Sequence, residues 1–308
     1  MTTINNIMVA IDLSPSSLDA LDRGFEITAC LNAQITLTHC IEIDFFSGIR
    51  ELIGTKAESI VSKAIENSRE QIETLASNPV RNRGISARIH VDSGLAFNVI
   101  SKQSELLDTN LLVTGYKGEN EAIKFGLGTT SSRLLRKSRC PVLIARNPCE
   151  GPYRTILIPV DFSHSSEMSI QLAKKIAPQS DVVLLHVFDM PYESKLRSAG
   201  ITSDEVSHYK STCVSNAFNE LNKLAVKCGI ENARYRSVVE IGHASKLIPD
   251  YSKQTQFDLI VMGKHGTHVT DEMLLGSVTK HVLNSSNADV LVVIDSRTPS
   301  LDLMHLHH

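Results

Sequence analysis

The sequence predicts an α/β fold made of two tandem copies of one domain, each with a five-stranded parallel sheet. Short apolar runs alternate with longer segments whose apolar residues recur at helical spacing. Such alternation is typical of a parallel sheet with helices on both faces. The same landmarks then return about 148 residues later, which indicates one structural unit present twice.

The repeat is carried by residues of different chemistry that keep the same spacing. Asp12 pairs with Asp161 (161 − 12 = 149), and Gly115 pairs with Gly263 (263 − 115 = 148). We therefore predict a first domain at 1–147, a linker at 148–152, a second domain at 153–297 and a tail at 298–308. The linker contains two prolines and a glycine, which suit a connection between domains.

Composition narrows the classes of function. The chain has 308 residues, 42% of them hydrophobic and 21% charged, with a net charge of −3. This balance gives no reason to expect a nucleic-acid or anionic-membrane surface. No apolar stretch approaches the ~18 residues of a membrane span, and the start lacks a signal-peptide pattern, so we expect a cytoplasmic protein. The six cysteines form no C-x-x-C pair and are expected to be free thiols.

In the first domain, strand 7–12 leads into a helix over about 16–31, because Ser14-Pro15-Ser16 supplies an N-cap and a proline near the first turn. Apolar residues at helical spacing predict a long helix near 51–76. The other predicted elements are strand 35–40, strand 87–91, helix 96–107, strand 111–114, helix 129–137 and strand 141–146.

The second domain repeats this order, with strands and helices alternating over 155–161, 165–177, 181–187, 205–228, 234–238, 244–254, 258–262, 277–285 and 289–294. In open parallel sheets, ligands bind beyond the carboxyl ends of the strands, where the strand order reverses. Asp12 and Gly115 lie at such ends, as do Asp161 and Gly263.

Two glycine loops predict where a ligand binds. Gly263-Lys264-His265-Gly266 follows an apolar run and is followed, after nine residues, by Gly276-Ser277; Gly115-Tyr116-Lys117-Gly118 and Gly128-Thr129 repeat it. Glycine lets the backbone turn sharply and approach a ligand closely. The last glycine of each loop precedes a helix, whose first N–H groups attract anions. Each domain therefore has a predicted phosphate site.

This G-x-x-G-x9-G-[ST] pattern resembles the nucleotide motif of the universal stress protein family, and both copies match its glycines. The strand-end aspartates and the histidines near the end of each second strand resemble the family too. The resemblance extends to about Ile294 and suggests a tandem member of the ATP-binding subclass. It implies a Rossmann-like domain similar to the adenine nucleotide alpha hydrolases, with ATP, ADP or AMP as ligand.

By position, the resemblance implies the following contacts. The aspartates would lie near the nucleotide, the residues after the second strands would meet adenine through their backbone, and the loops and helix starts would hold ribose and phosphates. These residues are Asp12, Cys40, Thr114, Gly115, Gly118, Gly128, Thr129 and Thr130 in the first domain, and Asp161, Val187, Met262, Gly263, Gly266, Gly276, Ser277 and Val278 in the second.

The first domain departs from the usual motif at two places. Thr129-Thr130 replaces Ser-Val, which keeps the hydroxyl but crowds the first turn, and Cys40 replaces a valine. The second domain is the closer match. Asp12 or Asp161 is also placed to help hold Mg²⁺ on a triphosphate.

Each singled-out side chain also has a structural alternative. The aspartates can cap the following helix, and His39 and His186 are better explained as satisfied core histidines. Lys117 and Lys264 can supply a charge to phosphate, although a solvent-facing position is favoured for both. His265 and His268 can meet phosphate as cations or lie in a solvated loop.

No P-loop and no G-x-G-x-x-G dinucleotide fingerprint occurs in the chain. We therefore predict a nucleotide-binding regulatory protein of the stress response, with slow ATP hydrolysis at most and no assigned catalytic residue. Two alternatives stay open: an enzyme of the related adenine-nucleotide group, and a nucleotide-free oligomeric scaffold.

The last strand of each domain is apolar and would lie at a sheet edge, which proteins tend to cover or pair. In the resembled family these strands pair between subunits. The resemblance thus implies an intrachain pseudo-dimer through the last strands, and a homodimer of whole chains.

Overall fold

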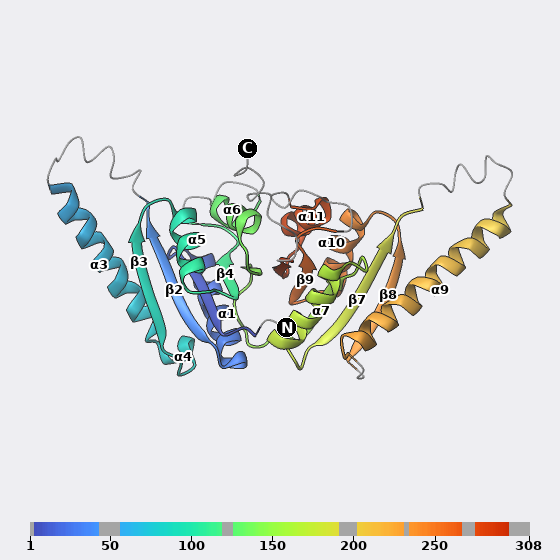
Figure 1. Ribbon diagram of the computed structural model, residues 1–308, viewed down its shortest axis with the longest axis horizontal. Coiled ribbons are helices and arrows are strands. Elements are labelled where there is room, and N and C mark those ends of the chain that lie inside the picture. Colours follow the sequence, from blue (N-terminus) through green and yellow to red (C-terminus); the bar gives the residue numbers. More distant parts are fainter. Residues whose placement is uncertain are drawn as a thin grey trace, which may run out of the picture. The chain divides into compact units, whose positions relative to one another are not determined.

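The computed structural model describes residues 3–42, 56–118, 126–190, 202–230, 234–266 and 275–295. The chain divides into two compact units, Met1–Pro152 and Tyr153–His308. Both units alternate strands with helices around a parallel sheet (Figure 1). The predicted fold class is thereby confirmed.

The first unit has five parallel strands in the order β3-β2-β1-β4-β5. Its elements, in chain order, are β1 (Asn6–Ile11), α1 (Pro15–Leu31), β2 (Gln34–Ile41), α3 (Lys56–Ala76), α4 (Pro79–Asn82), β3 (Ala87–Ser93), α5 (Ala96–Leu106), β4 (Leu111–Gly115), α6 (Thr129–Lys137) and β5 (Val142–Ala145).

The second unit has the matching order β8-β7-β6-β9-β10, again parallel. Its elements are β6 (Thr155–Pro159), α7 (His164–Ile176), β7 (Asp181–Phe188), α9 (Ser203–Lys227), β8 (Tyr235–Ile241), α10 (Ala244–Thr255), β9 (Leu259–Gly263), α11 (Ser277–Ser285) and β10 (Asp289–Val293).

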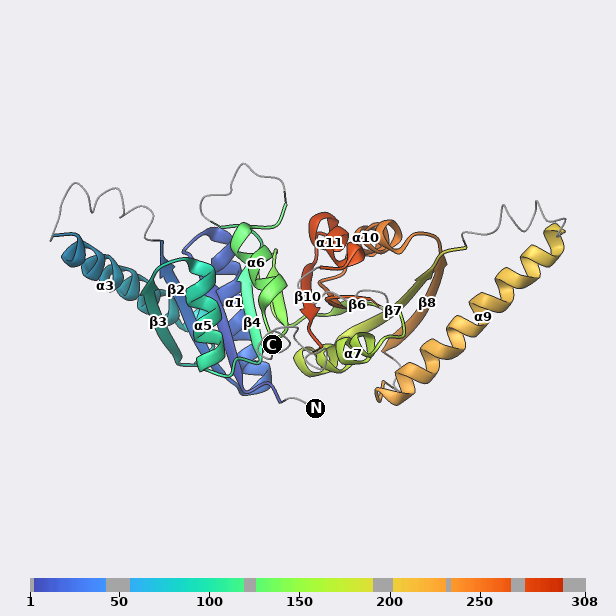
Figure 2. The same cartoon turned by 45° about the horizontal axis from the view of Figure 1, so that its top comes forward.

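This strand order fixes where helices lie and where a ligand can enter. The chain runs outward from β1 to β3, then returns to the other side of β1 for β4. Because such crossovers are right-handed, α1 and α3 cover one face of the first sheet and α5 and α6 the other (Figure 2). The strand order reverses between β1 and β4, and likewise between β6 and β9, so these are the expected ligand positions.

Local signals explain the helix boundaries. Ser14 caps α1 by accepting from the Ser17 N–H, with Pro15 in the first turn. α9 begins with a capping box in which Thr202 and Glu205 bond reciprocally. The short helix α4 was not predicted, although Asn78, which accepts from the Val80 N–H, is a recognisable cap. Among the described helices, none has the length and apolar character needed to cross a bilayer.

Helix α1 packs closely against β1. Gly24 faces the strand so closely that a Cβ there would lie 2.4 Å from Val9 Cγ2. Phe25 and Leu21 are fully buried beside it. The contact lets α1 lie directly on β1, and therefore positions the start of α1 at the carboxyl end of the sheet.

We predict that Gly24→Val lowers the free energy of unfolding by about 1–3 kcal/mol, because the added methyl groups overfill this contact. Ala29→Val, at an exposed position of the same helix, should change it by less than about 1 kcal/mol. Urea denaturation followed by circular dichroism measures both. Equal losses for the two variants would contradict the close packing of α1 on β1.

Candidate functional site

A cavity of about 270 Å³ lies at the carboxyl ends of β6 and β9, where the strand order of the second unit reverses. Loops after these strands and the start of α11 form its walls. All the residues singled out in the second domain line it: Asp161, Val187, Met262, Gly263, Gly266, Gly276, Ser277 and Val278.

The glycines of the loop allow close approach between backbone segments. A Cβ on Gly263 would lie 2.6 Å from Ser165 Cβ, and one on Gly266 would lie 2.9 Å from Asp161 Oδ2. The backbone bends at Lys264 and His265, and neither glycine has a left-handed φ. What the two positions need is the absence of a side chain, because the start of α7 and the Asp161 carboxylate are already in contact with the loop.

The start of α11 presents backbone donors to the cavity. Gly276 is its N-cap and no side chain caps the helix, while Ser277 and Val278 line the cavity. The loop is tied down behind it, because the Gly276 N–H donates to Lys264 O at 3.1 Å and Thr279 Oγ1 donates to Gly263 O at 3.0 Å. A helix start held in this way is suited to an anion.

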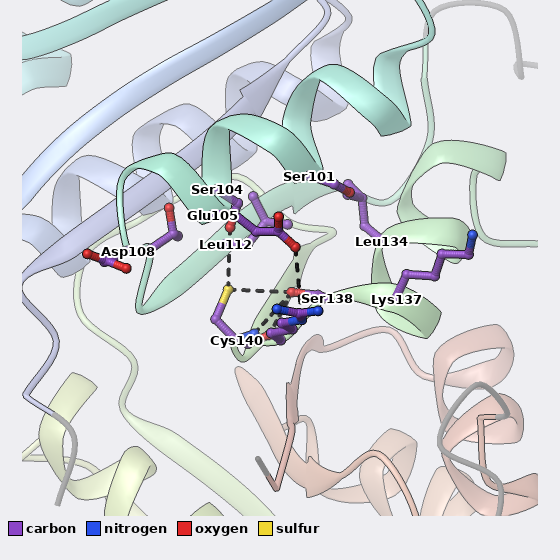
Figure 3. Close-up of a pocket in the computed structure, with 11 residues that line it drawn as sticks. Ser101, Ser104, Glu105, Asp108, Leu112, Leu134, Lys137, Ser138 and Cys140 are labelled. Atoms are coloured by element: carbon purple, nitrogen blue, oxygen red, sulfur yellow. Dashed lines mark hydrogen bonds and ion pairs between the residues drawn. The ribbon is translucent and has the colours of Figure 1, made fainter. Parts of the chain in front are cut away.

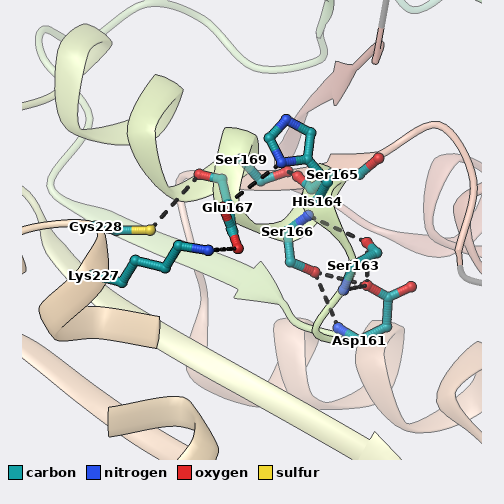
Figure 4. Close-up of polar contacts among 9 residues, drawn as sticks. All are labelled: Asp161, Ser163, His164, Ser165, Ser166, Glu167, Ser169, Lys227 and Cys228. Atoms are coloured by element: carbon teal, nitrogen blue, oxygen red, sulfur yellow. Dashed lines mark hydrogen bonds and ion pairs between the residues drawn. The ribbon is translucent and has the colours of Figure 1, made fainter. Parts of the chain in front are cut away.

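Asp161 holds the turn between β6 and α7 (Figure 4). Its Oδ1 accepts from Ser163 N at 3.1 Å, Ser163 Oγ at 2.5 Å and Ser166 Oγ at 2.8 Å. Ser163 in turn caps α7. The structural alternative therefore holds for Oδ1, while Oδ2 is the oxygen that faces Gly266.

The same region anchors α7 to the end of α9. Glu167, in the first turn of α7, pairs with Lys227 of α9 and lies 3.6 Å from His164 Nδ1 (Figure 4). The Cys228 thiol contacts the Glu167 carbonyl, and burial raises the pKa of that thiol. These contacts fix the helix that supplies one wall of the cavity.

The first domain is built in the same way at its matching place. Asp12 Oδ1 accepts from Ser14 N at 3.1 Å and Ser14 Oγ at 2.5 Å. A Cβ on Gly115 would lie 2.7 Å from Ser16 O, and one on Gly118 would lie 2.9 Å from Asp12 Oδ2. The motif glycines therefore serve the same purpose in both domains.

The remaining first-domain residues surround this framework. Gly128 caps α6 without a side-chain hydrogen bond, and Thr129 and Thr130 form its first turn. The Thr114 hydroxyl lies 3.2 Å from Ser131 Oγ inside the domain. Cys40 lies near the end of β2, where its thiol donates to Gly94 O; burial, with nearby Glu42 and Asp92, raises its pKa to about 11.

The histidines at the second-strand ends are satisfied, as predicted. His39 Nδ1 lies 2.8 Å from Ile11 O, and His186 Nδ1 lies 2.8 Å from Val160 O. The carbonyl accepts, so Nδ1 carries the proton. Each histidine links its strand to the neighbouring one just below the site.

The expectation for the loop lysines is wrong in the second domain. Lys264 is only 6% exposed, whereas Lys117 is half-buried. In the first domain Tyr116 stands at the position of Lys264, and the Arg146 guanidinium stacks 3.6 Å from the centre of its ring. The two loops thus share a backbone and differ in charge. His268 lies outside the described residues.

Several lining residues were not singled out from the sequence. They comprise serines and a threonine from the helix starts and apolar residues of the strand ends and of α10: Pro159, Val160, Ser163, Ser165, Ser166, Leu185, Ala244, Ile248 and Thr279. The serines could have been found, because Ser163-His164-Ser165-Ser166 repeats Ser14-Pro15-Ser16-Ser17.

The side chains that line the cavity do not form a site for a resident Mg²⁺ ion. Asp161 is the one carboxylate among the described lining residues, and its Oδ1 already accepts three hydrogen bonds. Groups of three or more His, Cys, Asp or Glu suited to a metal do not occur in the described parts of the chain. Magnesium stays an untested expectation from the sequence.

A separate cavity of about 270 Å³ lies at the opposite, amino-terminal ends of β4 and β5 (Figure 3). Ser104 and Ser138 contact the buried Cys140 thiol there, and burial raises the pKa of that thiol. None of the residues singled out from the sequence lines this cavity.

The fold and site together define a class: a doubly wound α/β domain, present twice, with a glycine loop and an uncapped helix start at the switch point. The Universal stress protein family matches residues 3–146 and 152–293, so the chain belongs to that family.

All six cysteines are free thiols, as expected for the chain.

Individual relatives agree with this assignment. A universal stress protein of Methanocaldococcus jannaschii is 29% identical over 153 residues, covering 46% of this chain and 94% of its own. Two solved structures are similar along almost the whole chain, both with a TM-score of 0.64. A universal stress protein from Archaeoglobus fulgidus is 19% identical and covers 95% of this chain and 99% of its own. A putative one from Pseudomonas aeruginosa is 17% identical and covers 96% and 95%.

We predict that Asp161→Ala lowers the free energy of unfolding by about 1–3 kcal/mol, because three donors lose their acceptor. Asp161→Asn keeps an oxygen at this place and should lose less than half as much. Thermal or urea unfolding of the two variants without ligand makes the comparison. If alanine and asparagine are equally destabilising, Asp161 does not hold the turn in the way described.

Proposed function

We propose that the protein binds adenine nucleotides, ATP foremost with ADP or AMP as alternatives, in the second-domain cavity and at the matching place in the first domain. It acts as a regulatory protein of the stress response and hydrolyses ATP slowly at most. The observation that carries the proposal is the convergence of a glycine loop, an uncapped helix start and an apolar wall on one cavity.

The polar end of the cavity suits the phosphates. Backbone N–H groups at the start of α11 and the Ser277 hydroxyl are donors, and the helix dipole adds positive potential. Such main-chain donors bind phosphate without an arginine. The bare loop at Gly263 and Gly266 lets the ligand approach the backbone closely.

The apolar residues of the lining suit a base. Leu185, Val187, Ile248 and Met262 are among them, and apolar walls with a few placed polar groups are typical of small-molecule sites. The choice of adenine rests on the resemblance to the ATP-binding subclass. The first domain has the same framework, with Cys40 at the position of Val187.

The alternatives make different predictions. An enzyme of the related group would turn ATP over at roughly 1–100 s⁻¹, as phosphoryl-transfer enzymes do, whereas we expect far less than about one turnover per second. A nucleotide-free scaffold would release no adenine nucleotide when protein purified without added ligand is heated and the supernatant analysed. Rapid turnover or failure to bind added ATP would each reject the proposal.

We further propose that the last strands of the two domains associate within the chain, and that two whole chains form a homodimer. Its basis is the apolar sequence of β5 and β10 and the family resemblance. Light scattering should then give about 68 kDa, twice the 33.9 kDa chain. A mass of one chain at micromolar concentration would contradict the homodimer.

We predict that Gly266→Val removes nucleotide binding from the second domain and Gly118→Val removes it from the first. A valine at either place meets the aspartate Oδ2 at about 2.9 Å and fills the space above the loop. Titration calorimetry should give two sites per chain for the unaltered protein, one for each single variant and none for the double variant. Ala29→Val is the control, with two sites retained. Unchanged ATP affinity in the double variant would contradict the proposed site.

A further inference from the structure

Among the described residues that line the cavity of the second domain, His265 is the one whose side chain can carry a positive charge. Asp161 and His265 are the titratable groups among its described lining residues, and neither lysine nor arginine is among them. Lys264, next to His265, is buried and is not part of that lining. Charge for a bound anion can therefore come from His265.

The position of His265 brings it close to the predicted phosphates. It lies between the two glycines of the loop, and its carbonyl oxygen is 3.1 Å from where a Cβ of Gly263 would be. Its Cα is 3.6 Å from the corresponding place on Gly276, the N-cap of α11. An anion held by the first N–H groups of α11 is thus next to the His265 backbone.

Building on the proposed function, we propose that His265 makes the second site favour ligands with more phosphates. Its imidazolium form makes a charge contact with the phosphates of ATP, and adenosine, which has no phosphate, lacks this contact. An imidazole is charged below its ordinary pKa of about 6.5 and neutral above it. Affinity for ATP in the second domain therefore rises as the pH falls, and the effect grows from adenosine to AMP to ATP.

The first domain supplies an internal contrast. Lys117 stands at the matching position (265 − 117 = 148), and a lysine keeps its charge throughout the neutral range. The same loop thus has a permanent charge in one domain and a switchable one in the other. Acidification strengthens only the second site, so the ratio of nucleotide on the two sites reports pH.

Other titratable or charged groups lie at this end of the sheet. Asp161 faces the loop, and Lys264 is buried beside His265. Three histidines lie on neighbouring elements: His186 bonds to Val160 O, His281 to Ser277 O at 3.0 Å, and His243 pairs with Asp189 at 2.9 Å. A variant that changes His265 alone separates its contribution from theirs.

The test uses the full chain with Gly118→Val, so that only the second site binds. Titration calorimetry gives the Kd for ATP, AMP and adenosine at about pH 6 and pH 8. With His265 present, ATP should bind roughly five-fold more tightly at the lower pH, as for a partly buried ion pair. Adenosine should change by less than two-fold.

His265→Gln should retain adenosine binding and lose the part of the pH dependence of ATP affinity that comes from His265. His265→Lys should bind ATP tightly at both pH values. The terminal phosphate itself titrates near pH 6, so the glutamine variant defines the baseline. In the Gly266→Val variant, only the first site binds, and its ATP affinity should have the same pH dependence as this baseline.

The outcomes separate the two proposals. If ATP binds but His265→Gln keeps the full slope, or adenosine shows the same slope as ATP, the role of His265 is rejected while the nucleotide site stands. If the unaltered chain binds no adenine nucleotide at either pH, the proposed function itself fails.

Discussion

The architecture of the site depends on close approach between backbone segments that only residues without a side chain allow. Gly263 lies against the start of α7 and Gly266 against the Asp161 carboxylate, at distances that leave no space for a Cβ. The same two contacts recur at Gly115 and Gly118. Once the loop is held there, the following helix begins beside the strand ends, and its unpaired N–H groups face the cavity.

Much of this was predictable from the sequence. Alternating elements and a repeat near 148 residues predicted two parallel-sheet domains, and the eight second-domain residues singled out by motif line one cavity. The burial of Lys264 was not predictable, because it depends on tertiary packing that a motif does not contain. The groups that the glycines contact were also not predictable, because a motif does not contain the neighbouring atoms.

The two domains show how one framework supports different chemistry. Aspartate, capping serine, paired glycines and uncapped helix start are shared, whereas the residues between the glycines differ. In the first domain, Tyr116 stacks with Arg146. In the second domain, Lys264 is buried and His265 lines the cavity. In the proposed function, backbone geometry therefore provides the donors for phosphate, and the loop side chains are the part of the site that differs between the domains.

The most direct test of the account is whether main-chain N–H groups at the two helix starts hold the phosphates. Amide chemical shifts of ¹⁵N-labelled protein, recorded during titration with ATP and separately with adenosine, report on each N–H group. The account predicts that the amides of Ser277, Val278, Thr129 and Thr130 shift strongly with ATP and only weakly with adenosine. Shifts confined to other regions of the chain, with these amides unchanged at saturating ATP, would contradict it.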